Sequence, residues 1–186
     1  KESLKAFHTA GFLGSEFSPF FLVEPDQAVD AVKPPDGMSD TRFAKRYKEY
    51  KKLLANSPIQ QHGSEHQKES LLKSIDNAHR LLSSPKARKA FDLSLESKES
   101  YDTYKVGGRF GLGCLLAKRL TEAGARFIEV THGYYPFKYW DTHDNGHTKM
   151  KDLKKMIDAP IAQLVLDLEK SKLLDRTLIV VASEFS

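Results

Sequence analysis

The stretch FGLGCLLAKRLTEAGARFIEVTH, residues 110–132, contains the change of pattern on which the predicted fold depends. Residues 110–124 have the apolar spacing of a helix, and Gly124 stands where such a helix would end. Residues 125–132, ARFIEVTH, have the near-continuous apolar pattern that is typical of a buried parallel strand. The stretch therefore predicts a helix followed by a strand of a buried sheet.

The same order of elements is predicted again near the end of the chain. Residues 148–171 favour a long helix, which Pro160 should kink or begin. Its apolar stripe consists of Leu153, Met156, Ile157, Ile161, Leu164, Val165 and Leu168. Residues 173–183, LLDRTLIVVAS, predict a second buried strand. A helix, strand, loop, helix and strand in this order predict an α/β fold with a parallel-type buried sheet and a helical subdomain.

Three regions differ in composition. Residues 1–40 are turn-rich and predict an extended segment, whereas residues 41–100 predict a helical subdomain or insertion. In the second region, Ser84 should cap a short helix that has Pro85 at its first position. Residues 101–186 form the predicted α/β core portion. The chain begins with a lysine and stops directly after a predicted core strand, so we expect an internal fragment of a longer protein.

Charge and composition narrow the class of protein. The net charge is +4, and 40% of the 186 residues are hydrophobic, which is usual for a globular domain. The longest apolar run is far below the ~20 residues of a membrane helix, so we expect no membrane span. The basic clusters between Arg42 and Lys98 alternate with acids, which favours a solvated helix face over nucleic-acid binding. Cys114 is the single cysteine and excludes an internal disulfide.

A cluster of metal-binding side-chain types lies between the two predicted strands. WDTHDNGH, residues 140–147, places carboxylates and imidazoles after the first strand, and such donors suit zinc, manganese or iron. The members of the cluster are Asp141, His143, Asp144 and His147, with His132 ending the first strand and Glu184 ending the second. The alternative is a polar turn, because Asp144-Asn145-Gly146 is itself a turn signal. His143 and His147 would share a face only in a helix.

The stretches FGLGCLLAKRLTEAGARFIEV, WDTHDN and TLIVVASEF resemble an uncharacterised family, the domain-of-unknown-function family numbered 1501. GFLGSEFSPFFLV and LLSSPKARKAFDLSLE also resemble it, so the likeness covers most of the chain. The family is similar to the alkaline phosphatase and sulfatase superfamily, which implies a three-layer α/β/α fold. Glu184 stands where that superfamily has aspartate, and Phe185 stands where it has a histidine ligand.

The resemblance also implies a set of site residues. Asp141 and His143 are the first candidates for metal ligands, followed by Glu184 and His147. Asn145 and His132 are candidates for binding the substrate. The resemblance places the nucleophile outside this chain, so no catalytic residue is assigned within it.

The implied function is that of a metal-dependent hydrolase of phosphate or sulfate esters, inactive as an isolated fragment. The expected cofactor is a divalent metal, namely zinc, manganese, calcium or magnesium, and the expected partner is a small anionic ester. The resemblance implies an exported or periplasmic parent, and the exposed edges of an incomplete sheet favour a homodimer. The alternative is a non-catalytic binding or scaffold relative, which the phenylalanine at position 185 favours.

Overall fold

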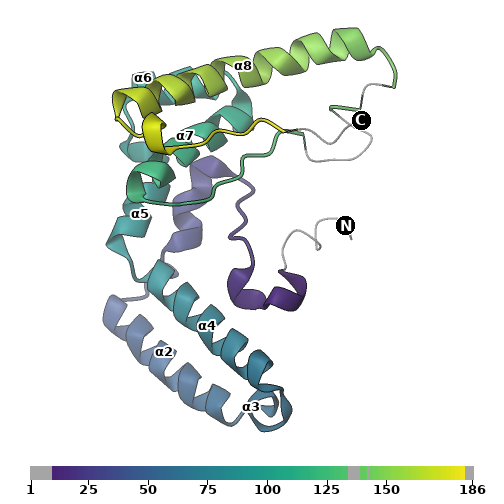
Figure 1. The fold of residues 1–186 in the computed structure, drawn as a ribbon. Coiled ribbons are helices and arrows are strands. Elements are labelled where there is room, and N and C mark those ends of the chain that lie inside the picture. The colour runs from purple at the N-terminus through teal and green to yellow at the C-terminus, as the bar shows by residue number, and fades with distance from the viewer. Residues whose placement is uncertain (1–9, 134–138, 142, 183–186) are drawn as a thin grey trace. The chain divides into compact units, whose positions relative to one another are not determined.

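The computed structural model describes residues 10–133, 139–141 and 143–182 (Figure 1). The chain divides into two compact units. The first consists of the chain up to Val23 together with Ala28–Lys89, and the second consists of Glu24–Gln27 and the chain from Ala90 onward. Of the described residues, 69% lie in α-helices or 3-10 turns and none lies in a strand.

The described part of the first unit contains three complete α-helices, most of a fourth, α5 (Pro85–Phe91), and several short 3-10 turns. The complete α-helices are α2 (Asp40–Ala55), α3 (Pro58–His62) and α4 (Glu65–Leu82), and the 3-10 turns are η1 (Gly11–Leu13) and η2 (Ser15–Phe17). The turn η3 (Pro25–Val32) includes residues of both units. Each α-helix begins after a serine whose hydroxyl accepts a backbone N–H, and in α4 Ser64 and Gln67 form a reciprocal capping box.

Helices α2 and α4 are joined by a stacked aromatic group. The imidazole of His79 in α4 lies 3.8 Å from the ring centroid of Tyr47 and 5.3 Å from that of Phe43, both in α2. The phenol of Tyr47 donates to Asp76, and Lys51 forms an ion pair with the same carboxylate at 3.1 Å. Phe43 and Tyr47 are four residues apart, so they lie on the same face of α2, and this face packs against α4.

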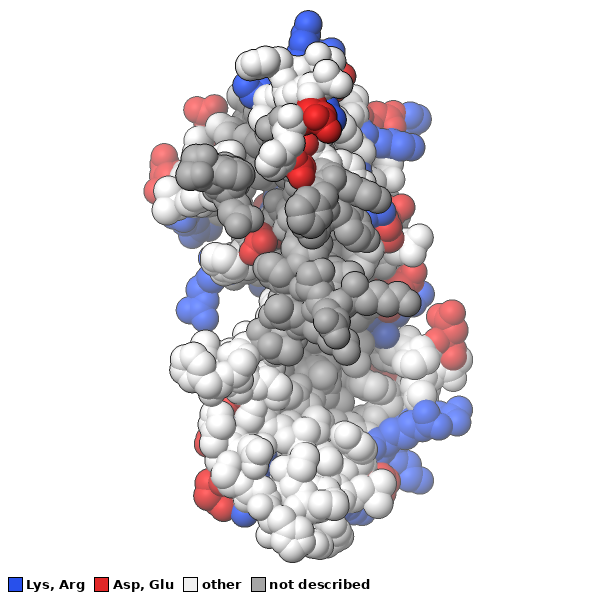
Figure 2. Space-filling view, turned by 90° about the vertical axis from the view of Figure 1, so that its right-hand side faces the viewer, with Lys and Arg blue, Asp and Glu red and all other residues white. Residues whose placement is uncertain are grey.

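Charged side chains of the first unit pair locally with residues of opposite sign. Lys52 pairs with Glu49, Lys68 with Glu65 and Lys73 with Glu69, each one turn of helix away. On the face drawn in Figure 2, basic and acidic side chains of the described residues are interspersed and form no large area of one sign. The basic stretches seen in the sequence are thus largely solvated helix surface.

The second unit is built on three helices that pack against one another. They are α6 (Lys98–Lys105), α7 (Gly108–Ala123) and α8 (Gly146–Lys170). The helix α5 (Pro85–Phe91) and the turns η4 (Leu93–Leu95) and η5 (Leu174–Arg176) complete the described elements. The largest buried side chains of this unit are Tyr104, Leu115, Leu168, Pro160 and Cys114. Among the described helices, none has the length and apolar character needed to cross a membrane.

Two of the helix ends agree with the sequence. Gly124 follows α7 with φ of 98°, a left-handed conformation that glycine adopts without strain. The hydroxyl of Ser84 accepts the backbone N–H of Ala87 at 3.1 Å, and Pro85 is the first residue of α5. Pro160 does not begin a helix, because α8 already starts at Gly146 and continues through it.

The predicted α/β fold is wrong for the described residues, which form a helical protein. Residues 125–132 and 173–183 were expected to be buried parallel strands. Residues 125–132 and 177–182 instead run as irregular chain without strand pairing (Figure 1), and Leu174–Arg176 form η5. Phe127 and Leu178 are each 87% exposed, so these runs are not buried either. An apolar run becomes a strand only when a neighbouring segment pairs with its backbone, and here the helices α6, α7 and α8 bury one another instead.

Candidate functional site

The candidate site lies in the connection between α7 and α8. It occupies the later part of this connection, from His132 onward. The indole N–H of Trp140 donates to both the Nδ1 atom of His132, at 2.9 Å, and its backbone carbonyl, at 3.0 Å. The rings of Phe110 and Tyr139 meet the His132 imidazole edge to face, with centroids 5.4 and 6.3 Å away. Trp140 is therefore a packing and hydrogen-bonding residue at the entrance to the loop.

Asp141 and His143 form a contact directly after Trp140. The Asp141 carboxylate accepts from the backbone N–H of His143 at 3.3 Å and also contacts the Nδ1 atom of its ring. The His143 side chain is 91% exposed, whereas that of Asp141 is 20% exposed. The contact from the ring and the hydrogen bond from the backbone of His143 hold the pKa of Asp141 below its usual value. The aspartate is thus an ionised acceptor that orients the histidine ring.

The loop ends where α8 begins. Asn145 adopts the left-handed conformation, with φ of 53°, and its carbonyl accepts the backbone N–H groups of Thr148 and Lys149, each at 3.1 Å. His147 lies in the first turn of α8 and is exposed, whereas His143 precedes the helix. The two histidines therefore do not share a helical face, because only His147 lies in the helix.

A shallow surface depression is lined by Asp141, His143, Asp144 and Lys149. Lys149 comes from the first turn of α8 and contributes to the lowered pKa of Asp141 through its charge. Sequence reasoning did not single out Lys149. Lys149 could have been recognised as a site residue from its position at the start of the helix that directly follows the polar loop. The depression thus presents an imidazole, two carboxylates and one cation to solvent.

The structure brings together some of the predicted site residues. Asp141 and His143 are in contact, whereas Asn145 begins α8 and His132 is engaged with Trp140. Glu184 and Phe185 lie outside the described residues. Within the part of the chain that is described, no three histidine, cysteine or acidic side chains are grouped closely enough to hold one metal ion. Among the described residues, Asp141 and His143 are therefore the two predicted ligands that lie in contact.

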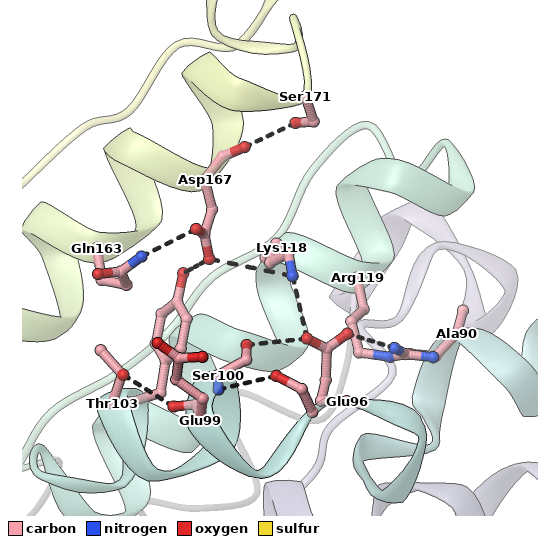
Figure 3. Close-up of polar contacts among 12 residues, drawn as sticks. Ala90, Glu96, Glu99, Ser100, Thr103, Lys118, Arg119, Gln163, Asp167 and Ser171 are labelled. Carbon is pink, nitrogen blue, oxygen red and sulfur yellow. Dashed lines mark hydrogen bonds and ion pairs between the residues drawn. The ribbon is translucent and has the colours of Figure 1, made fainter.

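A second polar cluster, not foreseen from the sequence, lies among α6, α7 and α8 (Figure 3). Glu96 accepts from Arg119, Lys118 and Ser100, and its side chain is only 11% exposed. Lys118 also lies 4.0 Å from Asp167 of α8. Lys118 and Arg119 interrupt the apolar run of α7, and this interruption was the sequence signal for a polar cluster. Because the cations and the carboxylates satisfy one another, the cluster serves to hold the helices in register.

The fold and the loop define a helical protein that carries an oriented aspartate–histidine pair on an exposed connection. The family described as "Protein of unknown function (DUF1501)" matches residues 1–186, and the chain belongs to this family. No curated protein and no solved structure matches the chain. The family predicted from the sequence is therefore confirmed.

Proposed function

We propose that the protein containing this chain is a divalent-metal-dependent hydrolase of phosphate or sulfate esters, and that the loop between α7 and α8 supplies part of its metal site. The observation that carries the proposal is the contact between Asp141 and the Nδ1 atom of His143. A histidine that ligates a metal commonly donates its other ring N–H to a carboxylate, which fixes its orientation and tautomer. The loop shows this arrangement on a side chain that is open to solvent.

The donor set fits a divalent cation in a specific way. Because Nδ1 of His143 faces the carboxylate, the lone pair on its Nε2 atom is directed away from Asp141 and is available to a ligand. His143 is then the ligand, and Asp141 is the group that orients it. Glu184 and His147 remain predicted further ligands, and Asn145 and His132 remain predicted substrate contacts. An imidazole ligand favours zinc over calcium or magnesium, and the carboxylates of the same loop also suit manganese.

The chemistry of the depression also suits an anionic ester. The bound metal would polarise an ester oxygen and lower the pKa of a hydroxyl nucleophile or of water. Lys149 lines the same depression, and its positive charge would attract a phosphate or sulfate group. WDTHDN and TLIVVASEF, which resemble segments of the alkaline phosphatase and sulfatase superfamily, support the same reaction class.

One observation favours a second function. Phe185 stands where the superfamily resemblance expects a histidine, and a phenylalanine ring cannot ligate a metal. A relative that keeps the loop but binds its ligand without turnover, as a binding or scaffold protein, is therefore the second candidate. It differs from the first because it predicts neither stoichiometric metal nor hydrolysis.

The test is metal content and ester hydrolysis in the full-length protein that contains this chain. We expect zinc or manganese near one or two ions per chain in the wild type, and hydrolysis of p-nitrophenyl phosphate or p-nitrophenyl sulfate. Replacing His143 by alanine should remove metal and activity together. The matched control is His66→Ala, which alters an exposed histidine of α4. A wild-type protein without metal and without activity would refute the hydrolase and favour the binding protein.

A further inference from the structure

We propose that His132 is a positioning residue for the Asp141–His143 pair: its neutral imidazole holds Trp140, and Trp140 fixes the start of the loop that carries Asp141. The inference deepens the proposed function, because it names what keeps the pair in place. It stands on the hydrogen bonds between Trp140 and His132. Neither bond involves a metal ion.

The chemistry of the two side chains fixes the state of His132. An indole N–H can only donate, so the Nδ1 atom of His132, 2.9 Å away, must be the acceptor and must be unprotonated. The neutral ring then carries its proton on Nε2. The same indole N–H also reaches the His132 carbonyl at 3.0 Å. Protonating the imidazole would place a proton on Nδ1 against the indole N–H, and only the carbonyl would remain as an acceptor.

The position of Trp140 explains why this contact controls the loop. Trp140 immediately precedes Asp141, so a change in the Trp140 backbone moves the carboxylate that orients His143. The chain at Tyr139 also lies close to the residue after His132, since a Cβ atom on Gly133 would be 2.7 Å from the Cβ of Tyr139. The His132–Trp140 contact therefore links the loop that begins at Trp140 to the segment that follows α7.

The surroundings of His132 favour the neutral ring. Burial lowers its pKa, so the imidazole is uncharged at pH 7. The side chains packed on the ring are Phe110 of α7 and Tyr139 and Trp140 of the loop. The neighbouring charged groups are engaged elsewhere: Arg109 pairs with Glu24, Glu129 accepts from Thr131, and Asp141 contacts His143.

Fluorescence tests the first half of the proposal, because Trp140 is the single tryptophan of the 186 residues. A protonated imidazole quenches indole emission, so the emission of the wild-type chain should fall in one step below about pH 6.5. The step should be absent in His132→Asn and His132→Phe, since neither side chain titrates in this range. His143→Asn is the matched control and should retain the step. A step that survives in both His132 variants would overturn the proposal.

The tautomer of His143 tests the second half without any metal. In ¹H–¹⁵N spectra at pH 7.5, the wild-type ring should carry its proton on Nδ1, against Asp141. His132→Asn should keep this state, because its amide oxygen offers an acceptor near the position of Nδ1. His132→Phe should shift the proton towards Nε2, which free imidazole side chains prefer. An unchanged His143 tautomer in His132→Phe would overturn the proposal. Failure of the proposed function is a different outcome: the wild-type His143 ring would carry its proton on Nδ1, but the protein would bind no metal.

Discussion

The phenol of Tyr104 in α6 donates to the Oδ2 atom of Asp167 in α8 at 2.9 Å, and the Tyr104 side chain is fully buried. Burial raises the pKa of Tyr104, and the adjacent carboxylate raises it further. The phenol therefore keeps its proton and remains a donor at neutral pH. The contact joins the first and last helices of the second unit through the inside of the bundle.

Replacing Tyr104 by phenylalanine should destabilise the chain by about 1–2 kcal/mol, because it leaves part of the Asp167 carboxylate without a donor. Asp167 would retain Gln163, at 2.9 Å, and the more distant Lys118. Urea unfolding followed by circular dichroism measures the change. Tyr101→Phe is the matched control on the same helix and should have little effect. Equal stabilities for the two variants would show that the Tyr104 bond contributes nothing.

Replacing Glu96 by glutamine should lower the free energy of unfolding by about 2 kcal/mol at pH 7, because Arg119 and Lys118 would lose their shared charged partner. Arg119 would keep its bond to the carbonyl of Ala90 at 3.2 Å. Glu99→Gln, at an exposed position of α6, is the control. A loss of similar size in both variants would contradict the assignment of this effect to the cluster.

The same carboxylate predicts a dependence of stability on pH. Burial raises the pKa of Glu96, but hydrogen bonds from Arg119, Lys118 and Ser100 outweigh it, and the net pKa lies below the usual value. As the pH falls, Glu96 takes up a proton in the unfolded chain before it does so in the folded chain. The contribution of ionised Glu96 to the free energy of unfolding is therefore complete above about pH 4.3, and it is lost as the pH falls through the pKa of Glu96 in the folded chain. Urea titrations from pH 6 to pH 3 should show a shallower loss for Glu96→Gln than for the wild type. Parallel curves would refute this assignment.

Replacing Gly111 by alanine should destabilise the packing of α6 against α7 by about 2 kcal/mol or more. A Cβ atom there would lie 1.8 Å from the backbone carbonyl oxygen of Tyr104, which cannot move without shifting α6. Gly113→Ala is the matched control in the same helix, since its Cβ would meet side chains and no backbone atom: a methyl group of Val130 at 2.8 Å and the Cγ atom of Pro25 at 4.0 Å. Both changes gain about 1 kcal/mol of helix propensity, so the difference between them isolates the clash. Thermal unfolding of both variants is the measurement, and similar melting temperatures would contradict the close approach.

Cys114 should be protected from alkylation in the folded chain. It is 2% exposed in α7, and burial raises the pKa of its thiol to about 12. Since the thiolate is the reactive form, iodoacetamide at pH 8 should modify the native chain far more slowly than the chain in urea. Mass spectrometry over time gives both rates. Rapid modification without denaturant would show that α7 opens readily.

Local patterns predicted the end of α7 and the start of α5, because a helix end is stabilised by groups within a few residues of one another. The spacing of residues 110–124 predicted α7, and Gly124 ends it in the left-handed conformation that glycine permits. Ser84 and Pro85 likewise predicted the start of α5. The candidate site was partly predictable for the same reason. Asp141 and His143 are two residues apart, so their contact is local, whereas the bond from Trp140 to His132 spans a separation of eight.

The family, the end of α7, the start of α5 and the residue types of the polar loop follow from the sequence alone. Only the tertiary structure decided the environment of the apolar segments 125–132 and 177–182, since pairing or burial of a strand depends on distant neighbours. Their composition suits strands, yet Phe127 and Leu178 are exposed and the described residues pair no strands. The tertiary structure also joined Glu96 to Arg119, because helix packing brings together residues that no local spacing relates.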